Sequence, residues 1–376
     1  MLEHNSKLIS LLFFYFKLFV VFAYLVYVVV LFGIRLRKFD HNDPVPNIKN
    51  ISIEQSKTFR DFAATMKTGL FIKNFPTFHI NKNNFTVDAT MWFEFYGSQL
   101  SLDVIEKFTF LNARIISKSA PDIKINKDKL LVTYQIVFDV KGNLNYKNFP
   151  LANHMLSIVM VNYSIMTNEM IFDDLDQANS FILSPEISGV EWGVHATNNF
   201  PGMIVASLDD HVKDKSVEYP AIGFTITFIR KSFKDLLVLF MPIFSATLFT
   251  WLSLLMNVSN EVGRFSLSIT AFTAILGYRF VIEQVSPQVG YFTLLDSFYL
   301  VFLALCFFVF VFHLVITAMW YVIDKKRSTD EAQGLLVEAA VTPSSMTSDS
   351  LKLVMDIAFG IFGVTLYGAT LYFLFY

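Results

Sequence analysis

Five long apolar runs constrain this chain more than any other feature of its sequence. They cover residues 18–34, 236–256, 265–282, 298–323 and 357–376, and only the third contains a charged residue, Arg279. A helix needs about 20 mostly apolar residues to cross the hydrocarbon core of a bilayer. The composition agrees, since 54% of the 376 residues are hydrophobic, against about 45–50% in soluble domains. We therefore expect a membrane protein with five spans.

The first run, within residues 1–38, has two interpretations. It is longer than the 7–15 apolar residues that are typical of a signal peptide, and no small-x-small cleavage site follows it. It ends instead in Arg35, Leu36, Arg37 and Lys38. An N-terminal anchor helix is therefore favoured, and a signal peptide remains the alternative.

Basic residues indicate an orientation, although they do not all agree. Residues 325–327 (KKR) and Lys352 mark the loop 324–352 as cytoplasmic by the positive-inside rule. Counting back through the spans then places the polar part of the chain outside the cytoplasm. Arg35 and Arg37 would also lie outside, against the rule, but long domains translocate regardless of such charges.

A polar block between the first and second runs predicts a β-sandwich over residues 67–229. It follows a linker, 39–66, in which Pro44 and Pro46 argue against a continued helix. Apolar and polar residues alternate in FTVDATMWFEF, YQIVFDV and FTITFIR, and turn-like clusters such as NKNN and KGN separate these runs. Several short alternating strands of this kind are typical of a sandwich.

The composition and motifs argue against several classes of function. A net charge of −2 gives no reason to expect a nucleic-acid partner. The single cysteine, Cys306, cannot form a disulfide within the chain, and the seven histidines lack metal-ligand spacing. No P-loop, nucleophile elbow or paired carboxylates occur, so we expect neither an enzyme nor a cofactor or metal.

The third run carries a regular polar stripe. At about 100° per residue, six of its residues lie within roughly 40° of one line along a helix. They are Ser266, Thr270, Thr273, Gly277, Phe280 and Gln284. Hydroxyls in a membrane helix often bond their own backbone carbonyls, but a whole face of this kind suits a water-filled lumen shared by several copies of the helix. Arg279 lies about 140° from the line, and we expect it to pair with Glu283 or to reach the interface.

The order of these features resembles the pentameric ligand-gated ion channels, in particular the bacterial branch that lacks the loop disulfide. GLFIKNFPTFHINKNNFTVDATMWFEF resembles the first two strands of their outer domain, and NFPLANHML resembles their Phe-Pro loop. Further matches lie at the start and body of the first pore-domain helix and in the link after the pore helix: Arg230, Pro242, Trp251, Pro287, Tyr291 and Asp296. The resemblance extends from about residue 67 to the C-terminus.

The resemblance implies a homopentamer in a cell membrane, with the β-sandwich outside and a four-helix pore domain over residues 230–376. Five copies of helix 264–284 would surround the pore and conduct small monovalent ions. Phe280 is the expected gate, because Thr273 occupies the deeper position that is usually leucine. A ring of Glu261 near the inner mouth favours cations, although Val262 and Gly263 separate this acid from Arg264, unlike in cation-selective relatives.

The resemblance also implies a ligand site and a coupling region. Ligands of the family bind between subunits in an aromatic pocket that attracts cationic amines. Tyr163 and Tyr219 match two aromatic positions, and Trp92 would come from the neighbouring subunit; ordinary sandwich aromatics are the alternative. Coupling to the pore would involve Phe149, Pro150, Arg230, Pro287, Tyr291 and Asp296.

The loop departs from the family at two positions. Ala152 replaces the usual acid that pairs with the arginine, and His154 replaces a glutamine. These departures, together with the extra N-terminal helix, leave a second hypothesis open: a non-conducting membrane sensor or scaffold that retains the receptor fold. A secondary transporter is a weaker alternative, because paired discontinuous helices are missing.

Overall fold

The computed structural model describes residues 2–37, 43–50, 62–173, 180–187, 192–207, 216–231, 233–332 and 343–375. The chain divides into two compact units. The helical unit comprises Met1–Lys38, Lys147–Leu151 and Phe233–Tyr376, and the β unit comprises Phe39–Tyr146 and Ala152–Ser232.

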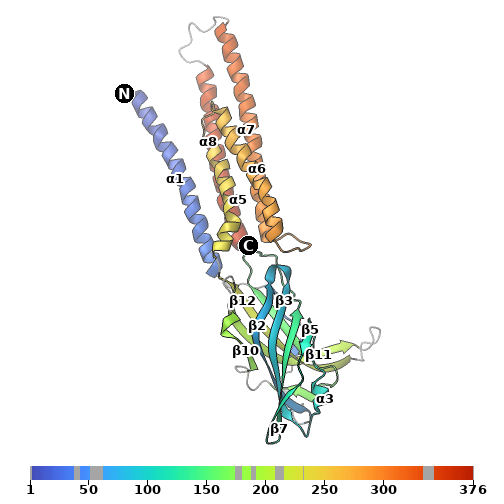
Figure 1. Ribbon diagram of the computed structural model, residues 1–376. Coiled ribbons are helices and arrows are strands. Elements are labelled where there is room, and N and C mark those ends of the chain that lie inside the picture. The colour runs from blue at the N-terminus through green and yellow to red at the C-terminus, as the bar shows by residue number, and fades with distance from the viewer. Residues whose placement is uncertain are drawn as a thin grey trace. The chain divides into compact units, whose positions relative to one another are not determined.

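The β unit contains two sheets (Figure 1). The first has the order β1-β11-β12-β8-β4, with β1 (Lys49–Asn50), β4 (Thr109–Phe110), β8 (His154–Val161), β11 (Trp192–Ser207) and β12 (Ser216–Arg230). The second has the order β10-β2-β3-β7-β5, and β6 and β9 pair with β7 and β2. Its strands are β2 (Ala64–His79), β3 (Asn84–Tyr96), β5 (Ala113–Lys118), β6 (Asp122–Asn126), β7 (Lys129–Val140), β9 (Met170–Phe172) and β10 (Phe181–Leu183). One short helix, α3 (Leu102–Ile105), follows β3.

The two sheets pack face to face through the apolar residues that alternate along their strands. In β3 every second residue from Phe85 to Phe95 is buried, as the alternation predicted. Rings from the two sheets meet between the layers: Phe110 stacks on Phe138 with centroids 4.5 Å apart, and Phe224 lies 5.2 Å from Phe181. The strand pattern therefore produces the layered β domain that the sequence indicated.

The helical unit holds five long apolar helices, which are α1 (Leu2–Arg37), α5 (Phe233–Ser253), α6 (Glu261–Val285), α7 (Leu294–Ala332) and α8 (Pro343–Phe375). Each contains a segment long and apolar enough to cross a membrane, so each of the five predicted spans falls on a helix. α1, α6 and α7 extend beyond both ends of their apolar runs, whereas α5 ends at Ser253, before the end of the run 236–256. In particular, α7 and α8 take up most of the predicted loop 324–352, and residues 333–342 lie outside the described part.

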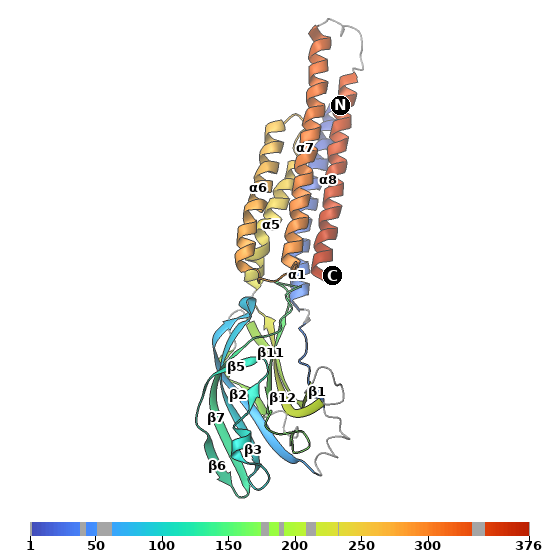
Figure 2. The same cartoon turned by 90° about the vertical axis from the view of Figure 1, so that its right-hand side faces the viewer.

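The helices pack side by side (Figure 2). α5 contacts α6, α7 and α8, and α7 also contacts α6 and α8. α1 contacts α8 and α5, so it lies at the opposite edge of the bundle from α6 (Figure 1). Trp251 of α5 is fully buried and stacks on Phe359 of α8, whose carbonyl oxygen accepts from the indole Nε1 at 3.2 Å.

The predicted linker 39–66 contributes to the β unit. β1 lies within it and pairs with β11, while β2 begins at Ala64, three positions before the predicted start of the sandwich. Residues 51–61 of this linker lie outside the described part.

Candidate functional site

The helix α6 has a defined start and end. Asn260 caps its N-terminus, because the side-chain oxygen accepts a hydrogen bond from the Gly263 amide at 3.1 Å. The helix ends at Val285, and the extended Ser286 leads to the buried Pro287. Between these ends the helix has no proline and carries the whole polar stripe.

All six residues of the polar stripe lie on the exposed face of α6. They are Ser266, Thr270, Thr273, Gly277, Phe280 and Gln284, and the ring of Phe280 is 72% exposed. The opposite face is buried against the other helices through Arg264, Ser268, Ala271, Ile275 and Ile282. The helix is therefore packed on its non-stripe side, and within one chain nothing described covers the stripe.

Arg279 is directed away from the stripe and is paired. Its Nε donates to Glu283 Oε1 at 2.9 Å, as the sequence predicted, and its Nη1 donates to Asp296 Oδ1 at 2.7 Å. The guanidinium also lies over the ring of Tyr299, 5.7 Å from the centroid. These contacts keep a fixed charge off the stripe and attach α6 to the first turns of α7.

The first turn of α7 contacts the segment Lys147–Leu151, which carries the Phe-Pro sequence. Lys147 O accepts from the Leu294 amide at 2.7 Å, and Phe149 O accepts from the Leu295 amide at 3.1 Å. The peptide bond between Phe149 and Pro150 is cis. Loop carbonyls thus satisfy amide groups that a helix N-terminus otherwise leaves unpaired.

The remaining turn around Asp296 is closed by reciprocal bonds. Asp296 Oδ2 accepts from the Thr293 amide and hydroxyl, and the Thr293 hydroxyl accepts from the Asp296 amide. Of the other predicted coupling residues, Pro287 is buried, whereas Tyr291 is exposed. The structure therefore groups Phe149, Pro150 and Asp296 around one helix start.

The basic end of α6 points into the bundle. Arg264 is fully buried, and its Nη2 donates to Val258 O at 2.7 Å and to Thr317 Oγ1 at 3.3 Å. Glu261, in the first turn, is partly exposed. At about 100° per residue around the helix axis, Glu261 lies roughly 140° from the stripe. The next residue, Val262, is 81% exposed. An effect of Glu261 on ions would therefore act from the helix end and not from the stripe.

Tyr163 and Tyr219 form an aromatic pair in the β unit. Their ring centroids are 5.1 Å apart at an interplanar angle of 77°, and Tyr163 is 44% exposed. Two backbone bonds hold the segment after β8, which carries Tyr163, against β12, which carries Tyr219: the Asn162 amide donates to Pro220 O, and the Thr167 amide donates to Glu218 O. The structure brings the two tyrosines together, and residues 208–215 lie outside the described part.

Trp92 lies on the other sheet. It is half-buried on β3, directly opposite Gly69 of β2. A Cβ atom at Gly69 would approach the Trp92 ring to 2.6 Å, so the glycine makes room for the indole. Within the chain, Trp92 therefore lies on the other sheet from Tyr219.

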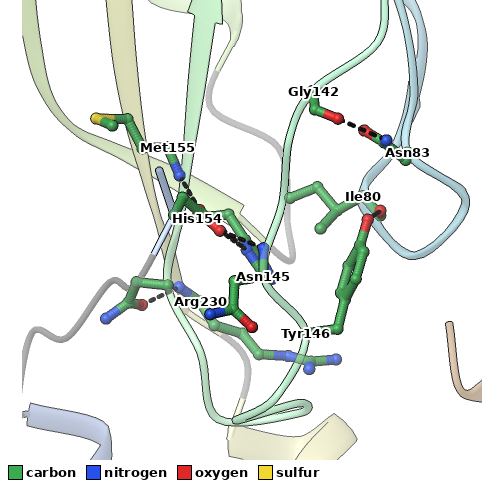
Figure 3. Close-up of polar contacts among 10 residues, drawn as sticks. Ile80, Asn83, Gly142, Asn145, Tyr146, His154, Met155 and Arg230 are labelled. Atoms are coloured by element: carbon green, nitrogen blue, oxygen red, sulfur yellow. Dashed lines mark hydrogen bonds and ion pairs between the residues drawn. The ribbon is translucent and has the colours of Figure 1, made fainter. Parts of the chain in front are cut away.

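Arg230, at the end of β12, meets an aromatic ring. Its guanidinium lies 5.6 Å from the centroid of Trp192. The Arg230 amide donates to Asn153 Oδ1 at 3.3 Å, and Figure 3 shows Arg230 in this region. Ala152, which replaces the acid of the family, is buried. The cation is thus accommodated in part by the face of an indole, an arrangement that no pattern in the sequence indicated.

A buried carboxylate that the sequence analysis did not single out lies near this loop. Asp43 Oδ1 accepts from the Asn145 amide at 2.6 Å, and its Oδ2 accepts from the Met155 amide at 2.6 Å and contacts His154 Nδ1 at 3.2 Å. Asn145, His154 and Met155 converge in Figure 3. Asp43 therefore ties together the two stems that flank segment 147–151. Its place in an irregular linker gave no periodic signal that could have identified it.

A lysine lies among aromatic rings elsewhere in the β unit. Lys118 Nζ is 4.2 Å from the ring centroid of Phe108 and 4.6 Å from that of Tyr134, and it donates to Glu106 O. Burial lowers the pKa of Lys118 and raises the pKa of Tyr134 to about 12. The Tyr134 hydroxyl is buried and has no hydrogen-bond partner among the described residues.

Comparisons with known proteins add no relative. A scan against protein-family models finds none that matches the chain, and a search of curated proteins finds no significant match. Within the described residues, no group of three or more His, Cys, Asp or Glu side chains is placed to hold a metal ion.

Proposed function

We propose that this chain is one subunit of a homopentameric ligand-gated ion channel of a cell membrane, with the β unit outside the cytoplasm. Four helices, α5–α8, form the pore domain, and five copies of α6 line the pore. A small cationic amine, bound between neighbouring β units, opens it. Small monovalent ions pass, and the Glu261 ring favours cations.

The single observation that carries the proposal is the exposure of the complete stripe on α6. Three hydroxyls and Gln284 face outward from a span of mean hydropathy 1.6, whereas α7 reaches 2.8. A polar face directed at acyl chains is unfavourable, because lipid offers no hydrogen-bond partners. In a water-filled lumen formed by several copies of α6, water hydrates these polar groups, so the unfavourable contact with acyl chains is avoided. The hydroxyls carry no charge and therefore allow ions to pass.

Two further arrangements support a ligand-controlled pore. The rings of Tyr163 and Tyr219, which lie edge to face, provide π faces on which an ammonium group binds. The carbonyls of Lys147 and Phe149 accept hydrogen bonds from the first turn of α7. Asp296 in the same turn binds Arg279 of α6. A movement of the Phe-Pro segment can therefore pass through α7 to the pore helix.

The sole cysteine makes a direct test possible. Cys306 is fully buried, so a charged thiol reagent should report only on an introduced cysteine. Thr273→Cys places a thiol on the stripe, and Ala271→Cys, on the buried face of the same helix, is the matched control. In planar bilayers with amine ligands, we expect the reagent to block currents of Thr273→Cys and to leave those of Ala271→Cys and of the unmodified chain unchanged.

The opposite result has a clear meaning. If the purified chain assembles as a pentamer but conducts under no ligand or pH condition, the sensor or scaffold is the better account. The observation that favours this second function is the replacement of the coupling acid by Ala152, which leaves Arg230 against Trp192. Equal modification of both cysteine variants would instead contradict the assignment of the pore face.

A further inference from the structure

The helix α1 is docked on α8 by specific polar contacts and not only by apolar packing. The Tyr24 hydroxyl and Thr370 Oγ1 lie 2.8 Å apart in a buried contact, and the Tyr367 hydroxyl donates to Val20 O at 3.3 Å. The rings of Tyr24 and Trp251 also pack edge to face, with centroids 5.7 Å apart. These contacts fix the position and rotation of α1 against α8 and α5.

One ion pair joins the same two helices within their membrane-spanning segments. Lys17 Nζ contacts Asp356 Oδ1, and the ammonium also lies 5.6 Å from the ring centroid of Phe359. Charged side chains in a span are costly and usually mark a pairing or a functional site. Both side chains retain some exposure, 14% for Lys17 and 31% for Asp356, so a polar group can still reach the pair.

An open cavity of about 450 Å³ adjoins this ion pair, between α1, α5 and α8. Its apolar lining includes Phe16 and Val20 of α1, Trp251 of α5, and Phe359 and Val364 of α8. Lys17 and Asp356 are the charged groups among the described lining residues. The backbone of α8 contributes Gly360, where an added Cβ would meet nothing within 4 Å. Its size and apolar lining are typical of sites that bind small apolar molecules.

We propose that this cavity binds one acyl chain of a membrane phospholipid whose headgroup carries both a phosphate and a hydroxyl. Because the lining belongs to membrane-spanning segments, acyl chains are the molecules that surround its opening. A phosphate oxygen accepts from the Lys17 ammonium, and a headgroup hydroxyl donates to the Asp356 carboxylate. A phosphocholine headgroup has no donor for Asp356, so the pair selects between lipids with identical chains.

Native mass spectrometry of the full chain in detergent tests this proposal. The protein is incubated with equal amounts of phosphatidylglycerol and phosphatidylcholine of the same chain length. We expect the wild type to retain phosphatidylglycerol at least fivefold more than phosphatidylcholine. Gly360→Leu, which fills the cavity, should reduce retention of phosphatidylglycerol at least tenfold. The matched control is Gly368→Leu, which adds the same side chain on α8 at a position that also has open space and does not line the cavity.

Two more variants separate the chain contact from the headgroup contact. Val364→Trp obstructs the cavity from an exposed position and should lower retention like Gly360→Leu. The double variant Lys17→Gln, Asp356→Asn should lose the preference between the lipids. Wild-type retention by both cavity variants, or equal retention of the two lipids by the wild type, overturns the proposal. Neither readout depends on conductance, so the result is distinct from that of the channel test.

Discussion

Arg279 Nη1 and Asp296 Oδ1 lie 2.7 Å apart and connect the C-terminal part of α6 to the first turn of α7. The same guanidinium binds Glu283 on its own helix, one turn away. The arginine is therefore held on the side of α6 that faces α7, and the stripe from Ser266 to Gln284 carries hydroxyls, a glycine, a phenylalanine and an amide but no charge. If the stripe lines a pore, as we propose, such an uncharged surface hydrates ions without binding them tightly.

The Arg279–Asp296 contact should stabilise the helical unit. Asp296→Asn removes the charge that binds Arg279 and weakens the turn with Thr293, and we expect a loss of about 1–3 kcal/mol, as for hydrogen bonds to charged groups. Glu283→Gln is the control, because this exposed pair on one helix is worth only about 0.3–0.5 kcal/mol. Thermal unfolding in detergent measures both. Equal effects of the two variants would show that Asp296 has no special role.

Phe280 should close the resting pore. Its ring is the large apolar group on the stripe, and five such rings would form a constriction that excludes water. Phe280→Ala is therefore expected to give current without ligand, at least tenfold above that of the wild type. Val281→Ala, the adjacent exposed position, should remain closed at rest. A Phe280→Ala channel that stays fully closed places the gate elsewhere.

Tyr219 should bind a cationic ligand through its ring. Tyr219→Ala removes the π face, and a cation–π contact of about 0.5–2 kcal/mol corresponds to a rise of roughly 2- to 30-fold in the ligand concentration for half-maximal current. Tyr219→Phe keeps the ring and should change this concentration less than twofold. Dose–response recordings with a series of small amines provide the measurement. If the phenylalanine variant loses as much as the alanine variant, the hydroxyl and not the ring is the important group.

Asp43 should hold the stems of the Phe-Pro segment. Asp43→Asn keeps the size of the side chain but loses the charge that faces His154 and the amides of Asn145 and Met155. We expect a loss of about 1.5–3 kcal/mol from the unfolding free energy of the β unit. Asp122→Asn, at an exposed position of β6, is the control and should change it by less than about 0.5 kcal/mol.

The same variant also tests the coupling. If Asp43 positions the loop, Asp43→Asn should reduce the maximal current while leaving the binding of ligand to the purified protein unchanged. A parallel loss of binding would indicate a general disturbance of the β unit.

The cluster around Lys118 should make the stability of the β unit depend on alkaline pH. Burial lowers the pKa of Lys118 in the fold, so the unfolded chain binds the extra proton and stability rises with pH up to the ordinary lysine value of 10.5. Tyr134 acts in the opposite direction. Its pKa of about 12 against an ordinary value of 10.0 means that the folded state keeps the proton longer, so stability falls as pH rises from 10 to 12.

Single substitutions separate the two groups. Tyr134→Phe should remove the fall above pH 10 and, because it deletes a buried hydroxyl without a partner, should stabilise the fold by about 1 kcal/mol near neutral pH. Lys118→Met should remove the rise below pH 10.5 and leave the fall. Unfolding followed by near-UV circular dichroism at several pH values measures these slopes. A Tyr134→Phe variant that still loses stability above pH 10 would contradict this assignment.

Features with a regular period were predictable from the sequence. The period of 3.6 placed the stripe of α6 on one face and Arg279 away from it, and the period of two identified the buried residues of β3. Contacts between distant segments have no such period. Asp43 lies 111 positions from His154, and Lys17 lies 339 positions from Asp356. Neither pair could be inferred from local spacing, because only the tertiary fold brings their charges together.

The pairing of α1 with α8 has a consequence for synthesis of the protein. Tyr24 and Thr370 are 346 positions apart, so the first span is made long before the helix on which it packs. Until then the ion pair between Lys17 and Asp356 cannot form. Assembly of the helical unit is thus completed only when the last span leaves the ribosome, and a chain that stops before Asp356 would lack both this ion pair and the contact between Tyr24 and Thr370.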